Sequence, residues 1–90
     1  MTPDLIAPKI IELLSERIQI EVASNEEDFV ASGMLDSLGL VELMASLEET
    51  FEIHIPFDEI EIDNFRSVTR IAEFVTSRMA VEEVEESVFF

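Results

Sequence analysis

The chain has 90 residues, of which 21 are acidic and 5 are basic, so its net charge is −16. This charge disfavours binding to nucleic acid and to anionic membranes, and the lack of cysteine excludes disulfides, a thiol nucleophile and a zinc–thiolate site. The apolar share of 48% is too high for a disordered acidic tail. The start, MTPDLIAPKII, lacks a secretory signal and no apolar run is long enough for a membrane span, so we expect a cytoplasmic protein.

The first predicted element is a helix from about Asp4 to Ile18. Its apolar residues recur three and four positions apart: Leu5, Ile6, Ile10, Leu13, Leu14 and Ile18. Residues 19–36 lack this spacing and hold a polar cluster, so they are expected to form a long loop. Three apolar residues are expected to pin the loop to the core: Phe29, Val30 and Leu35. A loop this long is uncommon in so small a domain unless it has a function.

The second predicted helix covers residues 37–51. Steps of about 100° per residue place six side chains on one apolar side: Leu40, Val41, Leu43, Met44, Leu47 and Phe51. The opposite side collects Leu38, Glu42, Ala45, Ser46 and Glu49. Asp36 is expected to be the N-cap, because its carboxylate can accept a hydrogen bond from a free amide of the first turn.

After this helix the sequence predicts a short extended segment that ends at Pro56 and a short helical turn within residues 58–64. Ser67 is expected to cap a last helix, about Val68 to Met79, with five residues facing inward: Val68, Ile71, Ala72, Val75 and Met79. The fold class is therefore all-α, with three main helices, one short helix and a long first loop. Residues 1–79 are expected to form one domain, and residues 80–90 an acidic C-terminal tail or an extension of the helix.

An enzyme is not expected, because a nucleophile needs a base within hydrogen-bond reach. The single histidine, His54, lies beyond the far end of the helix that begins with Ser37. A dedicated metal site is not expected either. The acidic run at residues 58–63 lacks the glycine and the closing glutamate of a calcium loop.

Ser37 remains as the residue that could carry chemistry. A first-turn or capping serine is the commoner role at such a position, but Asp36 already supplies the cap. An anion on Ser37 would lie at the positive end of the helix dipole. The position therefore suits the attachment of a group better than nucleophilic catalysis.

The residues around Ser37 resemble those of the acyl carrier protein family. The run LDSL at residues 35–38 is followed by VELMASLEETF at residues 41–51 and by IHIP at residues 53–56, in the order and register of that family. The resemblance covers about residues 4–79 and is specific over residues 33–56. It implies a four-helix bundle of acyl-carrier type.

The resemblance implies that Ser37 receives 4′-phosphopantetheine from coenzyme A by the action of a phosphopantetheinyl transferase, next to Asp36 of the motif. The thiol of this group would hold an acyl or aminoacyl thioester for a biosynthetic pathway. A loading ligase and a downstream synthase or transferase with a basic docking patch are the implied partners of a monomer. Four residues match the docking face of the family: Leu38, Glu42, Ala45 and Glu49. Three could line an interior for acyl chains: Leu40, Leu43 and Phe51.

The chain departs from fatty acid carriers at two places. Gly39 stands where they usually have an acid, and Leu35 stands where they usually have alanine. The chain looks closer to dedicated carriers, including D-alanyl, other aminoacyl and specialised polyketide carriers. The alternative function is an acidic helical adaptor that binds a basic protein without a prosthetic group.

Overall fold

Three α-helices and one short 3-10 helix form the computed structural model, which describes residues 3–56 and 60–88 and, among them, side chains up to residue 79. The elements are α1 (Pro3–Ile18), α2 (Ser37–Phe51), η2 (Ile62–Phe65) and α3 (Val68–Val88). The described residues contain no strand, which confirms the all-α prediction. The predicted short helix is a single 3-10 turn, and residues 58 and 59 of the expected stretch lie outside the described residues.

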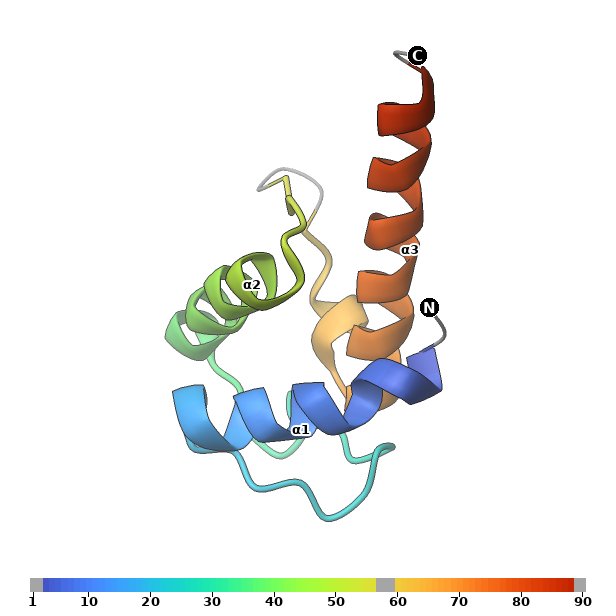
Figure 1. Cartoon of the computed structure of the whole chain (residues 1–90). Helices are drawn as coiled ribbons and strands as arrows, with labels where there is room; N and C mark the ends of the chain where they lie inside the picture. Colours follow the sequence, from blue (N-terminus) through green and yellow to red (C-terminus); the bar gives the residue numbers. More distant parts are fainter. Residues whose placement is uncertain (1–2, 57–59, 89–90) are drawn as a thin grey trace.

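The helix α1 lies across both other helices and packs against each of them (Figure 1). Its spaced apolar residues point into the core, except Leu5, which is exposed. The centre of the core contains fully buried side chains from all three helices, the long loop and η2: Ile10, Leu14, Phe29, Leu43, Leu47, Phe65, Ile71 and Val75. Each such side chain contributes about 1.5–3 kcal/mol when it is removed from water.

The helix α2 has the predicted bounds, but its buried side is narrower than predicted. Val41 was expected to face inward and is 48% exposed, whereas Ser46 was expected to face outward and is only 6% exposed. The buried arc is centred on Leu43 and Leu47. Val41 lies two residues before Leu43, about 200° around the helix, and so falls outside this arc.

The long loop between α1 and α2 is attached to the core as predicted. Phe29 and Leu35 are buried, and Val30 is partly buried against the same cluster. Backbone hydrogen bonds join the loop to α3 and to the residues just before it, from the Thr69 amide to the Asn25 carbonyl (3.1 Å) and from the Phe29 amide to the Arg66 carbonyl (2.7 Å). The loop that precedes α2 is therefore held in place by residues far away in the sequence.

The helix α3 begins as predicted, with the Ser67 hydroxyl accepting a hydrogen bond from the Arg70 amide. The expected inward residues up to Val75 are buried, and Met79 is partly buried. The backbone stays helical to Val88, and this last part of α3 extends beyond the other helices (Figure 1). The division at residue 80 into a domain and a tail stays a prediction.

Candidate functional site

The start of α2 has the N-cap that the sequence predicts. Asp36 has an extended backbone, and its Oδ1 accepts a hydrogen bond from the Gly39 amide at 2.7 Å. Its carbonyl accepts from the Leu40 amide at 2.8 Å. One residue thus satisfies two amides of the first turn, and Ser37 is left without a capping task.

Gly39 allows a close approach at this cap. A Cβ atom at position 39 would lie 3.2 Å from Asp36 Oδ1 and 3.3 Å from Leu35 Cδ1, which is closer than most such contacts. The first turn of α2 also contains no acidic residue. The departure from fatty acid carriers at position 39 therefore leaves room for the Asp36 cap and leaves no second carboxylate in the turn that Ser37 begins.

The Ser37 side chain is exposed. Within residues 3–56 and 60–88 its hydroxyl makes no hydrogen bond. The implied phosphodiester fits here. The Ser37 hydroxyl faces solvent, and it lies at the N-terminus of the 15-residue helix α2, where the helix dipole favours a negative charge. The Asp36 carboxylate opposes an added anion, but it is already engaged by the Gly39 amide.

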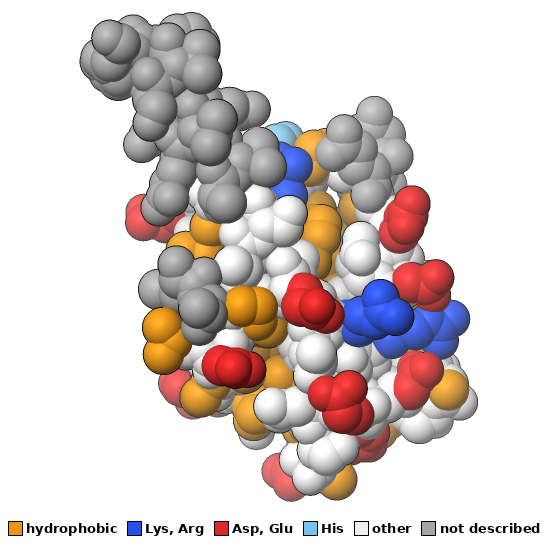
Figure 2. All heavy atoms as spheres, turned by 90° about the vertical axis from the view of Figure 1, so that its right-hand side faces the viewer, with side chains coloured by type: hydrophobic (Ala, Val, Ile, Leu, Met, Phe, Trp, Pro, Cys, Tyr) orange, Lys and Arg blue, Asp and Glu red, His pale blue; other side chains and the backbone are white. Residues whose placement is uncertain are grey.

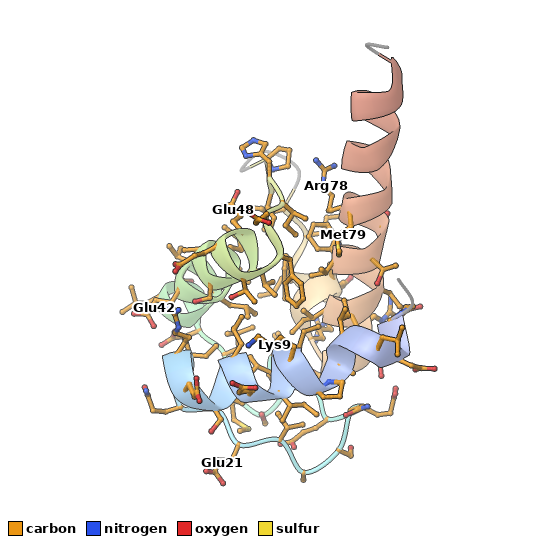
Figure 3. The ribbon with its side chains drawn as sticks, viewed as in Figure 1. Lys9, Glu21, Glu42, Glu48, Arg78 and Met79 are labelled. Carbon is orange, nitrogen blue, oxygen red and sulfur yellow. The ribbon has the colours of Figure 1, made fainter. Side chains whose placement is uncertain are left out.

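The four predicted docking residues lie along one exposed side of α2: Leu38, Glu42, Ala45 and Glu49. Figure 3 shows Glu42 on the outer side of α2, away from α3. Sequence reasoning missed two exposed apolar residues near the same helix end, Met34 and Val41. Leu38 is 69% exposed, so the surface around Ser37 is apolar as well as acidic.

Glu49 is not a free charge on this side of α2. Arg17, in the last turn of α1, lies 3.7 Å from the Glu49 carboxylate, and both side chains are largely exposed. Such a pair is worth about 0–1 kcal/mol and is screened by salt. Glu42 has no such partner within the described part of the chain.

His54 lies just beyond the other end of α2, and its side chain is exposed. Glu48 Oε2 accepts a hydrogen bond from the Ile55 amide at 2.8 Å and lies 3.4 Å from His54 Nδ1. The His54 carbonyl accepts a hydrogen bond from Arg78 Nε at 3.2 Å, and Figure 3 shows Arg78 reaching from α3 toward this segment. These contacts fix the exit of α2, and they place the histidine at the opposite end of the helix from Ser37.

Arg66 joins two parts of the chain that flank α2. Its guanidinium contacts Asp28 of the long loop at 3.3 Å and also bonds to Asp63 of η2. The hydrogen bond from the Ala31 amide, with the Arg66 charge and the Val30 amide, holds the pKa of Asp28 below its usual value. The hydrogen bond to Asp63, with the Asp28 charge, raises the pKa of Arg66. Figure 2 shows basic side chains bordered by acidic ones on the face that it draws.

The described residues offer neither a metal centre nor a membrane span. No group of three or more His, Cys, Asp or Glu side chains in them could hold a metal ion. None of the described helices is both long enough and apolar enough to cross a membrane.

Comparison with known proteins gives a family and a set of relatives. The family described as "Phosphopantetheine attachment site" matches residues 8–75. The D-alanyl carrier protein of Streptococcus pyogenes serotype M5 (strain Manfredo) is 39% identical over 71 residues, which cover 78% of this chain and 90% of that protein. The D-alanyl carrier protein of Streptococcus sanguinis (strain SK36) is 36% identical over 72 residues, which cover 79% of this chain and 91% of that protein. These relatives confirm the expected likeness to dedicated carriers.

Proposed function

The chain belongs to the acyl carrier protein family, whose members hold covalent 4′-phosphopantetheine, and from this premise we propose that Ser37 is the attachment residue. It is a carrier and not an enzyme, as its family indicates. One observation carries the assignment to Ser37. Its exposed hydroxyl begins α2 without a hydrogen bond in the described structure, while the neighbouring Asp36 makes the cap.

Each residue at this end of α2 has a separate part in the proposed attachment. Ser37 Oγ would supply the oxygen of the phosphodiester and lose its proton, while the pyrophosphate bond of coenzyme A breaks and adenosine 3′,5′-bisphosphate leaves. Asp36 keeps the first turn closed, and the remaining first-turn amides favour the negative charge. When bound, the prosthetic group supplies a thiol that carries the cargo as a thioester. The chain itself contains no cysteine, so this thiol would be its only one.

The cargo that we propose is a D-alanyl group. The support is that the relatives described above are named D-alanyl carrier proteins and are matched over about nine tenths of their length. The partners would then be a phosphopantetheinyl transferase, a ligase that activates D-alanine, and an acceptor enzyme with a basic docking patch. The acidic, partly apolar side of α2 around Glu42 is the surface proposed for docking, by a monomer that acts in the cytoplasm.

The cargo is tested by loading. The phosphopantetheine-bearing protein is incubated with ATP, a D-alanine-activating ligase and D-alanine, L-alanine or glycine, and its intact mass is measured before and after hydroxylamine. We expect one D-alanyl group that hydroxylamine removes, because a thioester is cleaved by this reagent. Equal loading of all three amino acids, or loading only by fatty acyl groups with an acyl ligase, would contradict D-alanine as the cargo.

The alternative of an adaptor without a prosthetic group does not agree with a family that carries one. No contact in the described residues favours it over the carrier.

A further inference from the structure

We propose that Arg66 is a positioning residue for Ser37, which acts through Asp28 by fixing the segment that leads into α2. This inference rests on the proposed function, because it concerns how Ser37 is presented to the transferase. Arg66 lies far from Ser37 in the sequence and outside the side of α2 proposed for docking. Its role follows from a chain of contacts that runs from η2 to the cap of α2.

The first step of this chain is a folded turn that begins at Asp28. Asp28 Oδ1 accepts hydrogen bonds from the Val30 amide at 3.0 Å and the Ala31 amide at 2.9 Å. The Asp28 carbonyl accepts from the Ser32 amide at 3.2 Å. A side chain that accepts from amides two and three residues ahead holds a turn in place of regular structure. The residues after Asp28 therefore move together with its carboxylate.

The second step attaches this turn to the rest of the molecule through Arg66. The Arg66 carbonyl accepts from the Phe29 amide at 2.7 Å, and Arg66 Nη1 lies 3.3 Å from Asp28 Oδ2 and 3.5 Å from Oδ1. Arg66 Nε donates to Asp63 in η2. Arginine suits this position because its planar group can serve two carboxylates at once. One residue thus joins the entrance of α2 to the connection that follows it.

The third step continues from the turn to Ser37. The Phe29 carbonyl accepts a hydrogen bond from the Leu35 amide at 3.1 Å, and both of these side chains are buried. Leu35 directly precedes the cap residue Asp36, and its Cδ1 lies close to Gly39 in the first turn. A displacement of the turn at Asp28 is therefore passed to the cap through buried groups and a backbone hydrogen bond.

Loss of the Arg66 charge should weaken the binding of the segment around Ser37 to the transferase. A loosened entrance has to be ordered when the transferase binds, so KM rises while kcat stays near its normal value. The side chains of Arg66 and Asp28 are partly exposed, which limits the effect. An exposed ion pair contributes little, so its loss should change KM by roughly two- to fivefold.

The test is a double-mutant cycle on the complete chain with Arg66→Gln, Asp28→Asn and both together. Asparagine keeps an oxygen for the Val30 and Ala31 amides and removes only the charge. Attachment of phosphopantetheine from coenzyme A by a transferase gives KM and kcat, and hydrogen exchange of the Leu35 and Gly39 amides reports the order of the entrance. Arg70→Gln is the matched control. Arg70 is exposed in the first turn of α3, and its replacement removes one positive charge, as Arg66→Gln does.

We expect each single variant to raise KM about two- to fivefold and to speed exchange at Leu35, with no further effect in the double variant. Arg66→Lys should recover part of the loss, and Arg70→Gln should behave like the wild type. Unchanged KM in Arg66→Gln, additive effects in the double variant, or an equal change in Arg70→Gln would overturn the inference. Wild-type protein that takes up no phosphopantetheine would overturn the proposed function instead. In that case, faster exchange of the Leu35 amide in Arg66→Gln would still show that Arg66 orders the segment that leads into α2.

Discussion

Two adjacent residues at the start of α2 have different tasks. Asp36 uses its side chain and its carbonyl for the first-turn amides, and Ser37 keeps its hydroxyl for solvent. A serine cap at position 37 would have used the hydroxyl that the proposed attachment needs. The separation of cap and hydroxyl was visible in the sequence, whereas the close contact between Gly39 and the cap was not, because it depends on the position of Leu35.

The cap makes a prediction for stability. Asp36→Ala should lower the free energy of unfolding by about 1 kcal/mol, because the Gly39 amide loses its acceptor. Asp36→Asn keeps an acceptor oxygen and should stay within a few tenths of the wild type. Urea unfolding followed by circular dichroism measures both variants. Equal losses in the two variants would mean that the charge matters and the hydrogen bond does not.

Gly33 makes a second prediction at the residue scale. Its φ of 78° lies in the left-handed region, where it ends the turn with a hydrogen bond from its amide to the Val30 carbonyl at 3.1 Å. Gly33→Ala should cost about 1 kcal/mol of unfolding free energy, although a Cβ there would meet no atom within 4 Å. Gly33→Asn should cost less, because asparagine tolerates this conformation. An alanine variant as stable as the wild type would contradict the strain argument.

At the scale of elements, the helices and the existence of the long loop were predictable, whereas the polar contacts that fix the loop were not. The spacing of apolar residues gave the bounds of α2 and nearly those of α1, because a continuous buried side leaves a clear period in the sequence. The predicted short helix is only a 3-10 turn. The rotation of α2 that exposes Val41 and buries Ser46 depends on how α1 and α3 pack against this helix. Asp28 and Arg66 are distant in the sequence, so no local sequence pattern predicts that they form an ion pair.

The loop makes a prediction for pH. The pKa of Asp28 is lowered in the folded protein, so its contribution to stability is present above its unfolded value of 3.8 and is lost as the pH falls through the lower folded value. Asp28→Asn should therefore lower stability at pH 6 and make the decline below pH 4 shallower, as measured by urea unfolding across that range. Glu21→Gln is the control, since Glu21 is exposed and points away from the helices in Figure 3. The same flattening in both variants would contradict a specific role of Asp28.

At the scale of the whole molecule, the net charge of −16 acts on every encounter with a partner. The charge attracts basic surfaces over a range of about 8–10 Å at ordinary ionic strength. The arrangement of side chains modifies this general attraction, because Arg17 lies 3.7 Å from the Glu49 carboxylate on α2. The sequence indicated the acidic side of α2 but gave no sign that a cation from α1 lies beside one of its members.

Docking should therefore depend more on Glu42 than on Glu49. Glu42→Lys should slow association with the transferase at low salt more than Glu49→Lys, and the difference should shrink as salt screens the charges. Stopped-flow association rates at several salt concentrations measure this. Glu21→Lys makes the same change in net charge away from α2, and an equal slowing by Glu21→Lys would mean that total charge, and not this surface, controls docking.

The attachment of phosphopantetheine to Ser37 is tested by the intact mass of the protein after incubation with coenzyme A and a phosphopantetheinyl transferase. Wild type, Ser37→Ala and Ser77→Ala are compared, since Ser77 is another exposed serine, located on α3. We expect the added mass of one phosphopantetheine on wild type and on Ser77→Ala, and none on Ser37→Ala. Modification of folded Ser37→Ala, or no modification of folded wild type, would contradict the assignment of Ser37 as the attachment residue.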